Sequence, residues 1–497
     1  MLIRFITVSL LVLKFITAAA YSQDAKSVLE KAARLMGATN LKTLQYSGTG
    51  AMYSFGQAAT PYERGPRFNY TSYTRVIDYE RPAMREESVR VEGENPLRGG
   101  AEQPLRGEAR SVQNATAESP GTRGGGAGGG LRQILFTPHG FVKQALKAGS
   151  ASLKAETVAG KTYDAVTIST DGKDKVIGYF NSDGMLEKIQ TWVDNNVLGD
   201  MLVEYTFSNY KDYNGVKFPT NLMAQQWKVL VFELTVQDVR TNVPADIKLE
   251  PQQQGAANRW WNPGAPGSPE LKQGAVVPVR LSESVWYMTD PTSGSPHHSV
   301  LVEFKDFLVM IEAPSSEARA EELLAVTKHM FPNKRIRFVV NTHPHFDHIG
   351  GLRRFAVEDI PIITHRSNLQ FFQEAFSNPR TINPDKLAKS GKKAEFIPGD
   401  AKYVITDSVR SIELHLMQNL EHSSGNYIAY LPMEKFMIEG CIYNPDYPNA
   451  VLDPPSPFTA GLYDNIMRLK LDVDLGIGLH GRVFPMTELA KYAGRTR

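Results

Sequence analysis

The chain has 497 residues, enough for more than one domain, and its 42% hydrophobic and 22% charged residues are typical of soluble globular proteins. Its 55 lysines and arginines nearly balance its 53 aspartates and glutamates, so we expect neither a nucleic-acid-binding surface nor an acidic tail. The single cysteine, Cys441, excludes an intramolecular disulfide.

Residues 1–20 have the features of a signal peptide. Arg4 precedes the apolar run Phe5–Leu13, and Ala18-Ala19-Ala20 offers a cleavage site before Tyr21. Lys14 interrupts the apolar run, so we expect no transmembrane span after cleavage. An uncleaved N-terminal anchor is the alternative. The prediction is a periplasmic or secreted protein.

Residues 24–250 predict a β-rich domain, an antiparallel curved sheet with the helix Ala25–Met36 packed against it. Hairpin turns are expected at Asp171-Gly172, Asp183-Gly184 and Asn214-Gly215. The predicted strands are rich in β-branched and aromatic residues: Leu44–Tyr53, Arg67–Ile77, Tyr163–Ser169, Val176–Phe180, Leu186–Val193, Met201–Phe207 and Val229–Val239.

Two segments interrupt this pattern. Residues 94–130 repeat Pro-Leu-Arg-Gly and end in a glycine run, which predicts a disordered insertion in the sheet. Residues 251–270 are rich in proline, glycine and glutamine and predict an interdomain linker. Trp260 and Trp261 within it are expected to pack on a neighbouring domain, with a place in a ligand groove as the alternative.

Residues 271–497 alternate strands and helices and predict an α/β domain. The expected helices are Ser315–Met330, Asn368–Phe376 and Thr459–Leu471. The expected strands are Val300–Phe304, Phe307–Ile311, Arg337–Asn341, Pro361–Thr364, Ile412–Met417, Tyr427–Leu431, Lys435–Glu439 and Leu475–Leu479.

A histidine-rich motif follows one of these strands. The apolar run Phe338–Thr342 ends in His343-Pro344-His345-Phe346-Asp347-His348. Ligands of α/β proteins bind at the carboxyl ends of strands, and imidazole and carboxylate groups are zinc ligands. Gly350-Gly351 would let the chain approach closely and begin a helix. The motif predicts a metal site.

The motif resembles that of the metallo-β-lactamase superfamily, and the resemblance extends over about Leu281 to Arg497. It implies an αβ/βα sandwich with two zinc ions at one edge. His343 and His345 would hold one zinc with His422, which precedes the strand Tyr427–Leu431. Asp347, His348 and His480 would hold the second.

Cys441 stands where most hydrolases of this superfamily place a bridging aspartate, although some β-lactamases of the family place a cysteine there. A thiolate is a good zinc ligand, so we favour ligation; a buried apolar cysteine is the alternative. Those lactamases also carry a lysine three residues later, where this chain has Asn444.

The resemblance implies a zinc-dependent hydrolase in which metal-bound hydroxide attacks an ester, amide or lactone bond of a small molecule, with Asp347 as the catalytic residue that orients the hydroxide. The alternative substrate is a β-lactam. Asn426 or Tyr443 would donate a further hydrogen bond to the substrate or else face solvent.

The remaining histidines lack partners at ligand spacing, and we expect His139, His329, His365 and His415 to be structural. His297-His298 end a loop that would hang over the metals in this fold, so a substrate-facing role is an alternative for them.

The N-terminal domain resembles the lipoprotein-carrier half-barrel of bacterial envelopes, most clearly over Tyr179–Pro219. This resemblance implies either an apolar ligand groove or a packing partner for the hydrolase domain, and we favour the latter. The alternative of another class is an envelope protein that binds a lipid, with a regulatory metal domain.

Overall fold

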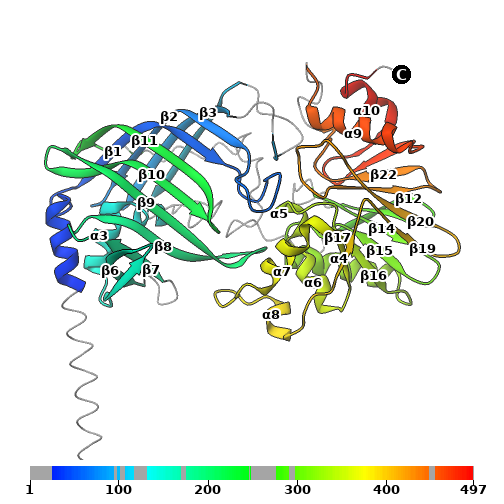
Figure 1. Cartoon of the computed structure of the whole chain (residues 1–497), viewed down its shortest axis with the longest axis horizontal. Helices are drawn as coiled ribbons and strands as arrows, with labels where there is room; N and C mark the ends of the chain where they lie inside the picture. Colours follow the sequence, from blue (N-terminus) through cyan, green and yellow to red (C-terminus); the bar gives the residue numbers. More distant parts are fainter. Residues whose placement is uncertain are drawn as a thin grey trace, which may run out of the picture.

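The computed structural model describes residues 25–93, 98–100, 107–116, 131–169, 175–245, 247, 276–289, 297–446 and 454–495. The predicted signal peptide, the linker with Trp260 and Trp261, and the Asp171-Gly172 turn lie outside the described residues. No helix among the described residues is both long and apolar enough for a membrane crossing. The described chain forms a large N-terminal sheet and two smaller C-terminal sheets (Figure 1).

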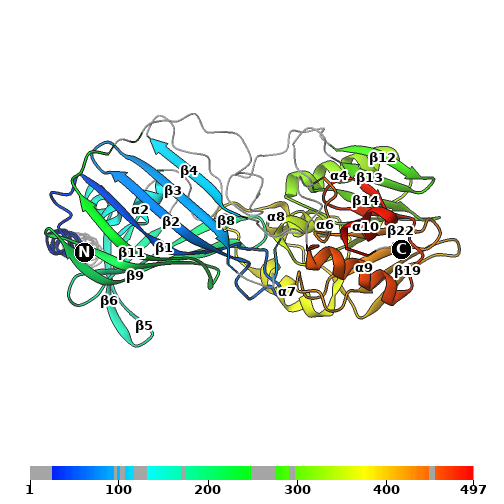
Figure 2. The ribbon, with the colours of Figure 1, turned by 90° about the horizontal axis from the view of Figure 1, so that it is seen from above.

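The N-terminal sheet has eleven antiparallel strands and is curved, as Figure 2 shows from above. Asn214 and Gly215 join two of its strands with φ values of 56° and 84°, which confirms the predicted hairpin turn. The spatial order of the strands is β4 (Ala109–Thr116), β3 (Ala83–Glu92), β2 (Arg67–Asp78), β1 (Thr43–Tyr53), β11 (Val229–Thr241), β10 (Val216–Gln226), β9 (Gly199–Tyr213), β8 (Leu186–Asn195), β7 (Val176–Phe180), β6 (Lys161–Ile168) and β5 (Ser152–Val158).

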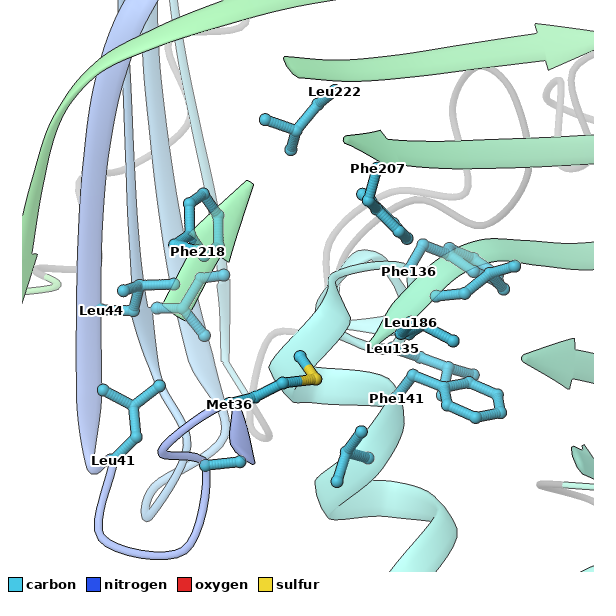
Figure 3. Close-up of a cluster of buried hydrophobic side chains, with 14 of the residues drawn as sticks. Met36, Leu41, Leu44, Leu135, Phe136, Phe141, Leu186, Phe207, Phe218 and Leu222 are labelled. Carbon is cyan, nitrogen blue, oxygen red and sulfur yellow. The ribbon is translucent and has the colours of Figure 1, made fainter. Parts of the chain in front are cut away.

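Two helices fill the hollow of this sheet. They are α2 (Arg132–Leu135) and α3 (Pro138–Lys147). Thr137 caps α3, because its hydroxyl accepts a hydrogen bond from the Gly140 N–H at 3.2 Å. Figure 3 shows the resulting core, in which Leu135, Phe136 and Phe141 lie close to Met36 and to strand side chains such as Leu186 and Phe207.

The prediction of a disordered insertion over residues 94–130 is wrong for part of that segment. Ala109–Thr116 form β4, which pairs along its whole length with β3 at the edge of the sheet. Most β4 side chains are not buried, because an edge strand is held by its backbone hydrogen bonds and needs no apolar side. A low apolar content therefore did not indicate disorder here.

The C-terminal region, residues 276–495, is a sandwich of two sheets; we call it the C-terminal sandwich. Strands β15 to β18 of the first sheet run parallel, as do β22 and β23 of the second. The first sheet has the order β12 (Val277–Ser282), β13 (Val285–Thr289), β14 (Ser299–Glu303), β15 (Leu308–Ile311), β16 (Ile336–Val340), β17 (Ile362–His365) and β18 (Phe396–Gly399). The second has the order β19 (Lys402–Thr406), β20 (Ser411–Leu416), β21 (Tyr427–Leu431), β22 (Phe436–Glu439), β23 (Leu475–Gly478) and β24 (Val483–Pro485).

Helices cover the outer side of each of these sheets. The core between the sheets contains Val309, Val340, Ile412 and Ile438, so it draws on both. On the first sheet lie α4 (Glu317–Met330), α6 (Leu352–Val357) and α7 (Leu369–Ser377), and on the second lie α9 (Pro457–Leu469) and α10 (Met486–Tyr492). The order helix, sheet, sheet, helix is the predicted αβ/βα sandwich. Helix α9 begins two residues before the predicted start, at Pro457.

One end of the N-terminal sheet packs against the C-terminal sandwich. Leu198 and Met201 join the core that α7 and α6 build on the first sheet. Arg380, just after α7, donates hydrogen bonds to the backbone carbonyls of Asn195, Asn196 and Val197 at 3.3, 2.9 and 2.8 Å. The turn between β8 and β9 is therefore anchored by a buried cation of the sandwich.

Candidate metal centre

The histidine motif forms a tight turn at the carboxyl end of β16. His343, His345, Asp347 and His348 are 0 to 4% exposed, so the loop is part of the interior. The short helix α5 (Phe346–Ile349) follows at once. A Cβ atom at Gly350 would overlap the Ser315 carbonyl, which confirms the close approach predicted for this glycine.

Three other strand ends bring the remaining predicted ligands to this loop. His422 precedes β21, Cys441 follows β22, and His480 follows β23. The donor atoms form two groups, each with all its atoms within 4.8 Å of one another. The first group is His343, His345, His422 and Cys441, and the second is Asp347, His348, Cys441 and His480. Cys441 belongs to both groups.

The histidine nitrogens converge in a way that suits a metal ion. His343 Nε2 lies 3.4 Å from His422 Nε2, and His348 Nε2 lies 2.9 Å from His480 Nε2. Burial lowers the pKa of His345 to about 4 and that of His343 and His422 well below the usual value. Neutral imidazoles are the form that ligates metals, so this donor set fits zinc.

The Cys441 thiol faces the metal centre. Its Sγ lies 2.9 Å from His348 Nε2, 3.2 Å from His480 Nε2 and 3.6 Å from Asp347 Oδ2. Its φ of 61° places it at a strained turn, a conformation that side-chain-bearing residues seldom adopt. A cysteine that only filled apolar space would not have three polar side-chain atoms around its sulfur.

Asp347 is the most connected carboxylate of the centre. Its Oδ2 lies 3.2 Å from His480 Nε2 and 3.3 Å from His297 Nε2, while its Oδ1 accepts a hydrogen bond from Gln57 Nε2 at 2.7 Å. Burial alone would raise the pKa of this carboxyl, but the surrounding imidazoles, His348 first, hold the pKa well below its ordinary value. Asp347 is therefore ionised.

Three residues at the centre were not among the predicted ligands. Glu312, directly after β15, accepts a hydrogen bond from the Thr342 N–H at 2.5 Å, and its other oxygen lies 3.3 Å from His348 Nδ1. Its position at a parallel strand end was a usable signal. The contact of His297 with Asp347 favours the site-facing alternative for that histidine. Gln57 comes from the N-terminal sheet, and no sequence signal indicated it.

Three further side chains considered in the sequence analysis, those of Asn426, Tyr443 and Asn444, are also buried. The Tyr443 hydroxyl donates to Glu488 at 2.9 Å, so the substrate-contacting role for Tyr443 is wrong. Asn426 and Tyr443 are 1% and 2% exposed, so the solvent-facing alternative is wrong for both. The Asn444 side chain accepts from the Asp446 N–H.

Three of the histidines expected to be structural have partners away from the centre. His139 contacts the Met36 carbonyl, His365 contacts Ser367, and His415 contacts Glu413.

Residues 292–436 match the family model described as the metallo-beta-lactamase superfamily. This match confirms, for that part of the chain, the resemblance inferred from the histidine motif. The segment contains five of the seven predicted ligands, from His343 to His422.

One curated relative is the 2,4-dinitroanisole O-demethylase subunit alpha of Nocardioides sp. (strain JS1661), 24% identical over 220 residues. That match spans 44% of this chain and 60% of the relative. Similar solved structures include a metallo-beta-lactamase from Pontibacter korlensis, 18% identical with a TM-score of 0.34, covering 44% of this chain and 97% of that one. The DIM-1 metallo-beta-lactamase is 15% identical with a TM-score of 0.35, covering 45% and 97%.

Proposed function

We propose that this chain is an exported, zinc-dependent hydrolase with two metal ions at the centre described above. His343, His345 and His422 would hold one ion, and Asp347, His348, His480 and Cys441 the other, with Cys441 close to both. The observation that carries the proposal is the pair of buried donor groups that share the Cys441 sulfur. Imidazole and thiolate ligands make up all of the first group and three of the four members of the second, and they suit zinc better than magnesium or calcium.

Bound zinc would supply a Lewis acid for a polarised carbonyl and would lower the pKa of a water molecule. The chain's own contribution is orientation. Asp347 is ionised and fixed from several sides, so its free acceptor capacity can orient an attacking water. A carboxylate oxygen of Glu312 lies 3.3 Å from His348 Nδ1, on the side of the ring away from the sulfur of Cys441, and its charge favours this orientation of the ring.

The substrate class we propose is a small molecule with an ester, amide or lactone bond. A β-lactam is the alternative, and the position of the Cys441 sulfur among the ligands favours it. Asn444 weighs against it, because an uncharged amide grips a substrate carboxylate less strongly than a lysine. The name of the curated relative adds aryl methyl ethers to the bonds worth testing.

A carrier of apolar ligands is less well supported as a function of the N-terminal sheet. The hollow of the sheet is occupied by the chain's own α2 and α3, with Phe141 fully buried there. We therefore propose that the sheet serves the hydrolase as a structural partner. Mass spectrometry of lipids extracted from the purified protein would contradict this if it found a stoichiometric ligand.

Metal analysis of the purified full-length protein tests the proposed function. We expect about two zinc ions per chain, and at most one in the His422→Ala variant. His415→Ala is the matched control, because His415 lies on the neighbouring strand and binds Glu413; its zinc content should equal that of the wild type. A well-folded wild type that takes up no zinc would overturn the proposal. Aryl esters, lactones, a chromogenic cephalosporin and an aryl methyl ether then separate the substrate classes.

A further inference from the structure

A loop of the N-terminal sheet enters the metal centre. It joins β1 to β2 and covers residues 54–66. The Phe55 ring meets the Phe346 ring edge-on with centroids 5.3 Å apart, and both rings belong to the core under the first C-terminal sheet. The loop therefore packs on the histidine motif itself, nearly 300 positions away in the chain.

Three backbone carbonyls of this loop accept hydrogen bonds from the two ligand-bearing loops of the sandwich. The Gly56 carbonyl accepts from the Phe346 N–H at 3.1 Å, and the Ala59 carbonyl accepts from the Ser424 N–H at 2.7 Å. Between them, the Ala58 carbonyl accepts from His345 Nε2 at 3.0 Å. The loop thus bridges the segment of His345 and the segment of His422.

The contact with Ala58 decides which nitrogen of His345 can ligate a metal. A carbonyl oxygen only accepts, so His345 Nε2 must carry the proton. The neutral ring then presents the lone pair of Nδ1, and this atom is buried without a hydrogen-bond partner among the described residues. The backbone of the N-terminal sheet therefore selects the tautomer of a proposed metal ligand.

The Gln57 side chain acts on the neighbouring ligand. Its amide nitrogen donates to Asp347 Oδ1 at 2.7 Å, which leaves Oδ2 toward Cys441 and His480. The backbone of Gln57 is fixed as well, because its backbone carbonyl accepts a hydrogen bond from the Gly100 N–H at 2.8 Å. Because the Gln57 amide fixes Oδ1, it also fixes the rotation of the Asp347 carboxylate and therefore the position of Oδ2.

We propose that residues 56–59 of the N-terminal sheet position the metal ligands of the sandwich, with Gln57 as a positioning residue for Asp347 and the Ala58 carbonyl as the group that sets the tautomer of His345. This inference rests on the proposed metal-dependent function. It assigns the N-terminal sheet a part in building the site, which neither resemblance implied.

The first test is the zinc affinity of the full-length Gln57→Ala variant, measured by competition with a chromophoric chelator. Loss of a hydrogen bond behind a metal ligand weakens metal binding by about 10- to 100-fold, and we expect a change in that range for the second ion bound. The visible spectrum of the cobalt-substituted protein should change with it, because Asp347 is free to rotate. Gln237→Ala is the matched control, an exposed glutamine on the same sheet, and should change neither readout.

The second test moves the carbonyls. Gly56 has a φ of 79°, and a Cβ atom there would lie 2.6 Å from Cγ of Phe346. Gly56→Ala must push the loop away from His345, so zinc affinity should fall by about 10-fold or more. Gly160→Ala is the matched control, because Gly160 has a φ of 81° in another turn of the same sheet with nothing within 4 Å. It carries the same backbone strain without displacing the loop.

The outcomes separate this inference from the proposed function. A wild type that binds no zinc would overturn the proposed function. A wild type that binds two ions, with Gln57→Ala and Gly56→Ala variants of equal affinity and identical cobalt spectra, would overturn the positioning role alone. Weaker binding in both variants but in neither control supports it.

Discussion

The N-terminal sheet and the C-terminal sandwich use strands of different kinds. Strand β1 has 11 residues that largely alternate between buried and partly exposed, whereas β21 has five residues that are all buried. A sheet built from short strands buried on both sides has many strand ends for its size. Each end is followed by a loop that can carry polar side chains without disturbing the core. A sheet built from long strands with one buried side has a large surface but few strand ends for its size. The candidate metal ligands therefore gather in the sandwich, and the N-terminal sheet reaches them through the loop at residues 54–66, which follows the end of β1.

The largest effect of a single substitution is expected at Cys441, which belongs to the sandwich and to its metal centre. Cys441→Ala should lower hydrolytic activity by about 1,000-fold or more, because it removes a donor shared by both metal positions. Steady-state kinetics on the best substrate of the panel measures this. The Cys441→Asp variant should retain two zinc ions, since a carboxylate is also a zinc ligand. Unchanged zinc content and activity in Cys441→Ala would mean that the thiol only packs.

The second effect tests whether the two regions unfold together. Arg380→Ala should lower the free energy of unfolding by about 3 kcal/mol, because it leaves two buried carbonyls and one part-buried carbonyl of the β8–β9 turn without their donor. Urea denaturation followed by circular dichroism checks this, and the transition should separate into two steps. Arg366→Ala, an exposed arginine paired with the exposed Asp400, should leave the curve unchanged. A single unshifted transition in Arg380→Ala would show that the contact does not couple the regions.

The third effect is a pH dependence confined to the N-terminal sheet. Burial, with a smaller contribution from the Lys143 charge, lowers the pKa of His139 to about 4, although the hydrogen bond that Nε2 donates to the Met36 carbonyl acts in the opposite direction. The unfolded chain therefore binds the proton more tightly, at a pKa of about 6.5. The stabilisation is complete above that pH and is lost as the pH falls toward 4, by about 2 kcal/mol at pH 5.

A comparison of wild type with His139→Gln isolates this term. At pH 7 the variant should be less stable, since it loses the stacking on Phe218. At pH 5 the difference in stability between the two proteins should be smaller, because only the wild type has a buried imidazole whose low pKa destabilises the folded state in acid. The metal centre is the same in both proteins, so its contribution cancels in the difference. A gap between the two urea midpoints that is the same at both pH values would refute the assignment.

Much of the fold could be predicted because its elements are amphipathic. The hairpin at Asn214-Gly215 and the buried strands β16 and β21 follow from local pattern. Strand β4 was missed because its pairing, and not its composition, orders it. Helix α3 was also missed, although Thr137 and Pro138 at its start are an ordinary helix-start signal.

The candidate site was predictable to the extent that its residues follow strands. The seven proposed ligands lie at strand ends, and the structure brings their donor atoms together. Gln57 was not predictable, because it comes from a loop between two strands of the other region and shares no motif with Asp347. Contacts between two regions that are far apart in the sequence leave no periodicity in it.

The smallest effect concerns how the N-terminal sheet is held together locally. Gly215 has a φ of 84° at the β9–β10 turn, and an added Cβ would meet nothing within 4 Å. Gly215→Ala therefore changes only backbone strain, and we expect a loss of about 1 kcal/mol in the free energy of unfolding. Gly149→Ala is the matched control, since Gly149 also has open space but its φ lies outside the left-handed region. If both variants lose the same free energy of unfolding, the conformation of Gly215 is not what stabilises the turn. If only Gly215→Ala loses stability and its zinc content equals that of the wild type, the hairpin stabilises the N-terminal sheet without affecting the metal centre.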